Sequence, residues 1–162
     1  AFAKVALSYQ DWQLVLAGNG EVDEARLLAT ELGIPNQIIL LGWVNGELKH
    51  KAFCEAKVLC LPSYAEGFPM AVLDAWAYGL PVITTPVGGI PDVAIDGENM
   101  LLFNPGDLDG LASKLDIIMK EPQLRYSLAK ASRYMSENQF SLVNITGQVA
   151  DIYNFLCPKV KK

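Results

Sequence analysis

The chain has 162 residues, of which 51% are hydrophobic and 19% charged, and its formal net charge is −5. This length is enough for one domain with a substantial core, and the apolar content predicts that part of the surface faces another domain. The acidic balance argues against a nucleic-acid groove, which needs a basic stripe, and no apolar run approaches the ~18 residues of a membrane span.

Helical and extended patterns alternate along most of the chain. The predicted helices cover residues 1–10, 21–32, 48–56, 69–79, 107–120, 122–139 and 142–155, with one further helical turn at 91–95. The predicted strands cover residues 12–17, 37–41, 58–62, 81–85 and 100–103. This alternation predicts an α/β fold, a Rossmann-like parallel sheet with helices on both faces.

Glycine-rich turns follow four of the predicted strands. They contain Gly18 and Gly20, Gly42, Gly67, and Gly88 with Gly89. Ligands of such folds bind at the carboxyl ends of the parallel strands, so we expect these turns to line one rim of the sheet.

The most informative turn runs from Glu66 to Asp74, between a buried strand and a helix. A strand, a glycine turn and a helix N-terminus form an anion site, but Glu66 would repel a bare phosphate. Carboxylates there fit better as acceptors for sugar hydroxyls, which predicts a nucleotide sugar as ligand. The spacing alone is equally compatible with Glu66 as a capping charge and Asp74 as a solvated helix residue.

Other features carry weaker signals. Gly88-Gly89 fits a phosphate nest or an ordinary turn, and Gly18-Asn19-Gly20 is short of a dinucleotide fingerprint. Trp43 could stack on a base or pack in a core or domain interface. His50, the single histidine, lies in a polar stretch and is expected to face solvent. No cysteine, histidine or aspartate cluster has metal-ligand spacing, so no metal site is predicted.

Three segments together resemble the donor-binding half of the retaining glycosyltransferases of group 1 (family 4), which have the two-domain GT-B fold. They are Pro-Ser-x-x-Glu-Gly-Phe-Pro-Met at 62–70, Asp-Ala-x-Ala-x-Gly-x-Pro-Val at 74–82, and Gly-Gly-Ile-Pro-Asp at 88–92. Supporting segments lie at 16–20, 39–42, 96–99 and 104–107, so the resemblance extends over residues 12–156.

The resemblance implies roles for individual residues. Glu66 would act in catalysis by holding the hydroxyls of the donor sugar, and Asp74, where glutamate is usual, would hold the ribose. Pro69 stands where a glycine is common in the family. The donor-binding residues implied in this way are Gly18, Gly42, Trp43, Glu66, Gly67, Phe68, Pro69, Met70 and Asp74.

The implied reaction is retaining transfer of a hexose from a UDP- or GDP-linked sugar to an acceptor hydroxyl, in polysaccharide or glycoconjugate biosynthesis. No metal or other cofactor is expected. Residues 1–162 would form the C-terminal nucleotide-sugar-binding domain. An N-terminal domain for a sugar or lipid-linked sugar acceptor would be absent, so this chain alone is expected to be inactive. The full enzyme is expected in the cytoplasm, or peripherally on the inner face of the membrane.

The resemblance also implies that a first, central strand with the arginine and lysine that clamp the diphosphate is missing. The chain could compensate for this missing strand by an altered sheet, by local disorder or by strand exchange between copies. The alternative function is a non-catalytic or epimerase-like nucleotide-sugar-binding module of the same fold. An epimerase would need a histidine or acid on the rim, and His50 is poorly placed for that role.

Overall fold

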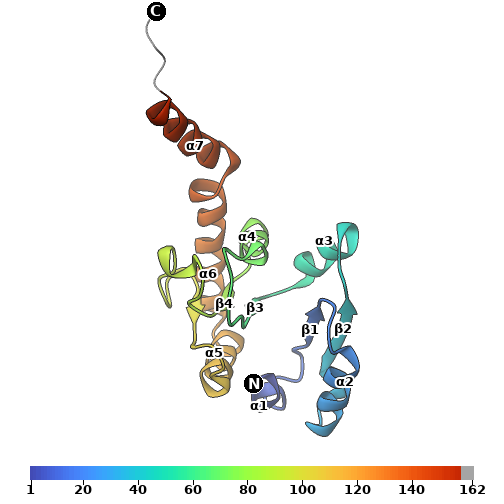
Figure 1. Ribbon diagram of the computed structural model, residues 1–162. Helices are drawn as coiled ribbons and strands as arrows, with labels where there is room; N and C mark the ends of the chain where they lie inside the picture. Colours follow the sequence, from blue (N-terminus) through green and yellow to red (C-terminus); the bar gives the residue numbers. More distant parts are fainter. Residues whose placement is uncertain (158–162) are drawn as a thin grey trace, which may run out of the picture.

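A computed structural model describes residues 1–157 and shows an α/β fold (Figure 1). The strands are β1 (Leu14–Ala17), β2 (Ile38–Gly42), β3 (Leu59–Leu61), β4 (Val82–Thr84) and β5 (Leu101–Leu102). The helices are α1 (Phe2–Ala6), α2 (Val22–Glu31), α3 (Gly46–Glu55), α4 (Met70–Ala77), α5 (Leu108–Lys120), α6 (Pro122–Tyr134) and α7 (Leu142–Leu156). Short 3-10 turns occupy Pro35–Gln37 and Ile90–Asp92, and a π-helical turn, Met135–Gln139, extends α6.

The strands form two parallel sheets in the part of the chain that the structure describes. β1 pairs with β2, and β3, β4 and β5 form the second sheet in that order. The predicted alternation and parallel pairing are confirmed, but the single sheet is divided between β1 and β3. Each of these strands has a described partner on one side only, and Val15 and Leu16 of β1 remain 45% and 39% exposed.

Left-handed glycines follow the ends of two helices. Gly33 follows α2 with φ 73°, and Gly79 follows α4 with φ 67°. Glycine adopts this conformation without the Cβ clash of other residues, so it is common just beyond a helix. Pro81 then prevents α4 from resuming and leads the chain into β4.

The first helix is shorter than predicted, because it ends at Ala6 and not near Gln10. The side-chain amide of Gln37 lies within hydrogen-bond distance of the carbonyls of Ala6, Tyr9 and Trp12, at 3.1, 3.2 and 3.1 Å. These contacts hold the segment after α1 against the start of β2. The helical spacing of the first ten residues is therefore overridden by a contact that is distant in sequence.

A core cluster around Trp76 lies behind the turn between β3 and α4. Trp76 is fully buried, and its ring is 6.2 Å from that of Phe68 and 5.1 Å from that of Phe140, centroid to centroid. The other buried members of the cluster are Val72, Ala75, Leu80, Val82, Ile90, Met100 and Met135. Through this cluster, α4 packs against the second sheet.

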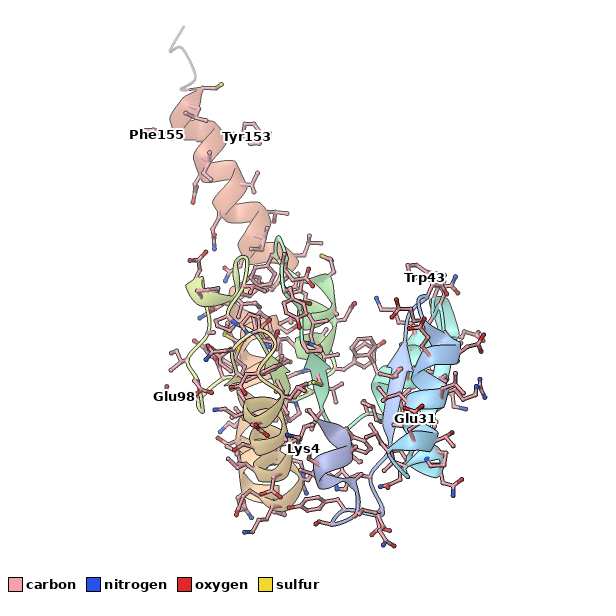
Figure 2. The ribbon with its side chains drawn as sticks, turned by 60° about the horizontal axis from the view of Figure 1, so that its bottom comes forward. Lys4, Glu31, Trp43, Glu98, Tyr153 and Phe155 are labelled. Carbon is pink, nitrogen blue, oxygen red and sulfur yellow. The ribbon has the colours of Figure 1, made fainter. Side chains whose placement is uncertain are left out.

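Helix α7 extends away from the rest of the described chain (Figures 1 and 2). None of its residues is buried, and Val143 and Phe155 are 82% and 83% exposed. A helix that is apolar on most sides usually packs against other protein. Helix α7 thus carries part of the exposed apolar surface predicted from composition. None of the described helices is both long and apolar enough to cross a bilayer.

Replacing Ser132 should destabilise the junction of α4 and α6. Ser132 is fully buried, and its hydroxyl donates to the Leu80 carbonyl at 2.7 Å. Ser132→Ala leaves that carbonyl without its donor, so the free energy of unfolding in urea should fall by about 1–3 kcal/mol. Ser127→Ala, at an exposed position of the same helix, is the control and should change it by less than about 0.5 kcal/mol. Equal values for both variants would contradict this role.

Candidate functional site

The predicted strand, turn and helix around Glu66 are present. β3 ends at Leu61, the turn occupies residues 62–69, and α4 begins at Met70. Pro69 is the N-cap residue and is buried, and no side chain among residues 1–157 caps the amides that follow it. The first amides of a helix point outward along the axis, so the start of α4 presents donors and a positive dipole end to a ligand.

Ser63 holds the Glu66 carboxylate, and Thr85 in turn holds Ser63. The Ser63 hydroxyl donates to Oε1 of Glu66 at 2.7 Å, and the buried Thr85 hydroxyl donates to the Ser63 carbonyl at 2.6 Å. Glu66 therefore binds Ser63 and does not cap α4 through a hydrogen bond. Its half-buried carboxylate retains capacity to accept further hydrogen bonds.

Gly88 and Gly89 let the loop after β4 approach the Glu66 turn. A Cβ atom on Gly88 would lie 2.2 Å from the Gly67 carbonyl oxygen and 2.5 Å from that of Glu66. The Gly89 amide donates to the Gly67 carbonyl at 2.7 Å, and a Cβ there would lie 2.7 Å from the Phe68 ring. Because neither glycine has a side chain, the loop after β4 can pack directly against the Glu66 turn. The sequence pattern did not reveal this role.

The remaining residues of the turn play different parts. The Phe68 ring packs against Trp76 and Phe140 and belongs to the core cluster behind the turn. Met70 is 68% exposed, and Asp74 follows one turn later on the same face of α4. The Asp74 carboxylate is not simply solvated, because its Oδ2 lies 2.6 Å from the Lys49 ammonium of α3. Lys49 gave no signal in the sequence, since this pair joins two separate helices.

A second group of predicted residues lies on the other sheet. The Gly18 amide donates to the Gly42 carbonyl at 2.7 Å, at the carboxyl ends of β1 and β2. A hollow of about 220 Å³ there is lined by Leu16, Ala17, Gly18, Asn19, Gly20, Glu21, Val22, Ala25, Leu40 and Gly42. Trp43 follows and is 68% exposed at the end of this sheet (Figure 2). The predicted site residues therefore form two groups, one on each sheet, and not the single rim that the sequence predicts.

The described residues contain no group of three or more histidine, cysteine, aspartate or glutamate side chains that could hold a metal ion. His50 is exposed, as predicted, but its Nδ1 is paired with the Tyr78 hydroxyl at 2.6 Å. His50 thus belongs to the contact between α3 and α4, one residue beyond Lys49.

The model of the family described as "Glycosyl transferases group 1" matches residues 1–135. Among curated relatives, N-acetyl-alpha-D-glucosaminyl L-malate synthase of Bacillus anthracis is 31% identical over 154 residues, which are 94% of this chain and 40% of that enzyme. The chain spans two fifths or less of the curated relatives that it matches.

Two solved proteins show the same fold. Anabaena HepE in complex with UDP superposes with a TM-score of 0.82 at 21% identity, over 94% of this chain and 44% of that one. Its complex with UDP-glucose gives 0.76 at 22% identity, over 88% and 41%. The C-terminal domain of the group 1 protein LpcC from Francisella tularensis gives 0.78 at 25% identity, over 87% of this chain and 76% of that one.

The close approach of the two loops predicts that Gly88→Ala is more damaging than an alanine at another left-handed glycine. Gly97 is the matched control: its φ is 82° and a Cβ added there would meet no atom within 4 Å, whereas Gly88 has a φ of 59° and a 2.2 Å contact. Both substitutions cost about 1–2 kcal/mol of backbone strain. Gly88→Ala should cost about 1–3 kcal/mol more in unfolding free energy, because the Glu66 turn must shift. If chemical denaturation shows the same loss of unfolding free energy for both variants, the Glu66 turn can shift without cost and this prediction is wrong.

Proposed function

The chain belongs to the group 1 glycosyl transferases, and we propose that its turn between β3 and α4 binds the nucleotide-sugar donor of a retaining hexosyl transfer. One observation carries this proposal: the fixed carboxylate of Glu66 stands beside the uncapped N-terminus of α4, with Asp74 one turn into that helix. Two carboxylates that can accept hydrogen bonds from hydroxyl groups thus lie on either side of an anion site. This order matches the sugar, the diphosphate and the ribose of a nucleotide sugar.

Each group has a separate part in the proposed site. Glu66 accepts hydrogen bonds from the sugar hydroxyls, and the amides of Gly67, Phe68 and Met70 donate to the diphosphate. The buried Pro69 shapes the turn and supplies no amide. Asp74 accepts from the ribose. Catalysis then depends on orienting the donor and stabilising the leaving diphosphate through amides and the helix dipole, without a metal ion.

The group at the ends of β1 and β2 is proposed to receive the base. Gly18 and Gly42 leave the hollow at this rim open, and the exposed Trp43 offers an aromatic face for stacking. The UDP complex of HepE makes UDP the first nucleotide to test, and GDP the second.

The complete reaction is assigned to a longer protein in which residues 1–162 form the C-terminal donor domain. The relatives that the chain matches are at least about two and a half times its matched length, since it covers 40% or less of them. The exposed apolar surface of α7 supports a further packing partner. The acceptor, a sugar or lipid-linked sugar, would bind outside this chain, which alone would not complete a transfer. A cytoplasmic enzyme acting in polysaccharide or glycoconjugate assembly fits this arrangement.

The epimerase-like alternative is not supported by the position of the only histidine. His50 lies on α3 and is paired with Tyr78, which follows α4 at its far end from the Glu66 turn. It is therefore not beside the proposed diphosphate position.

Two substitutions separate the sugar and nucleotide halves of the site. Glu66→Gln should weaken UDP-glucose binding about tenfold or more and leave UDP binding unchanged, because Glu66 meets only the sugar. Asp74→Asn should weaken both ligands to a similar degree, because both contain the ribose. Calorimetric titration of the two variants against the wild type measures these ratios.

The control for this pair is Glu98→Gln, an exposed carboxylate on another loop (Figure 2), which should bind both ligands like the wild type. The same series with GDP and GDP-mannose tests the second base. If the Glu66→Gln variant binds all four ligands with wild-type affinity, Glu66 does not contribute to the binding site.

A further inference from the structure

Three contacts hold α3 against α4. The Lys49 ammonium pairs with Asp74, the His50 ring pairs with the Tyr78 hydroxyl at 2.6 Å, and the Phe53 ring stacks on Tyr78 at 5.2 Å between centroids. Asp74 and Tyr78 are four residues apart, so these contacts follow one face of the helix. The face that carries the proposed ribose acceptor is thus only partly covered by α3, since the Asp74 side chain remains 29% exposed.

The ion pair between Lys49 and Asp74 is partly sheltered. The Lys49 side chain is 41% exposed and that of Asp74 is 29% exposed. The ammonium also lies 5.9 Å from the centroid of the Phe53 ring, which favours the same position. Oδ2 is the Asp74 oxygen closest to the ammonium, at 2.6 Å, and among the described residues no further ion pair or side-chain hydrogen bond engages this carboxylate.

We propose that Lys49 is a positioning residue of the donor site, which holds the Asp74 carboxylate in place to accept a ribose hydroxyl. This inference rests on the proposed function. A carboxylate that is already held loses less side-chain freedom when the ligand binds, so the nucleotide binds more tightly. Lys49 acts through Asp74 and does not itself contact the ligand.

Removal of the ammonium tests this role. Lys49→Met should weaken UDP binding about three- to tenfold, the range expected for one side chain that must be ordered on binding. Binding of 2′,3′-dideoxy-UDP should not change, because that nucleotide lacks the hydroxyls that Asp74 would accept. Lys49→Arg should restore most of the UDP affinity, since a guanidinium can also bind one carboxylate oxygen.

A double-mutant cycle shows whether Lys49 acts through Asp74. In the Asp74→Asn background, Lys49→Met should have no further effect on UDP binding. Lys51→Met is the matched control on the same helix. Lys51 is 69% exposed, and it pairs with Glu55 at 3.8 Å, so UDP affinity should stay at the wild-type value. Thermal unfolding of each variant checks that it is folded, and Lys49→Gln replaces Lys49→Met if that variant is not.

Several results would overturn this role. Unchanged UDP affinity in Lys49→Met would do so, and so would equal weakening of UDP and 2′,3′-dideoxy-UDP, which would indicate a phosphate contact or a structural role. A Lys49 effect that persists in the Asp74→Asn background would also contradict action through Asp74. Failure of the wild type to bind UDP, UDP-glucose, GDP or GDP-mannose would instead overturn the proposed donor site, and this inference with it.

Discussion

The site depends on the contact between two backbone loops, one after β3 and one after β4. The Gly89 amide donates to the Gly67 carbonyl, and Gly88 leaves no room for a Cβ atom above the Glu66–Gly67 peptide. With the parallel pairing of β3 and β4, this contact sets the height of the turn above the sheet. The positions of the Glu66 carboxylate and of the first amides of α4 follow from it.

Packing behind the turn and polar contacts beside it complete the constraint. The Phe68 ring is inserted beside Trp76, so the turn cannot lift without opening the core, and Ser63 orients Glu66 from the side. The face of α4 beyond the turn is held by α3 through Lys49. The proposed sugar and diphosphate positions therefore lie on the second sheet and its core, whereas β1 and α7 keep exposed apolar surface that suits additional packing partners.

Local patterns in the sequence were enough to predict the strand, turn and helix at 58–79, and the parallel pairing. Local patterns could not predict contacts between distant segments. Gln37 shortens α1, Lys49 pairs with Asp74, and the two glycines after β4 meet the Glu66 turn only in the folded chain. The sequence left an altered sheet open as one of three possibilities, and local strand patterns could not choose among them.

A nucleotide sugar is proposed to bind at the start of α4. The most direct test is to follow the backbone amide resonances of the labelled chain by NMR during titration with UDP-glucose. We expect saturable shifts that are largest at Gly67, Phe68, Met70 and Asp74, with a second set at Gly18, Gly42 and Trp43. Saturable shifts confined to residues outside both groups, for example along α5 or at the hollow beside Arg26, would place the ligand elsewhere and overturn the proposed site.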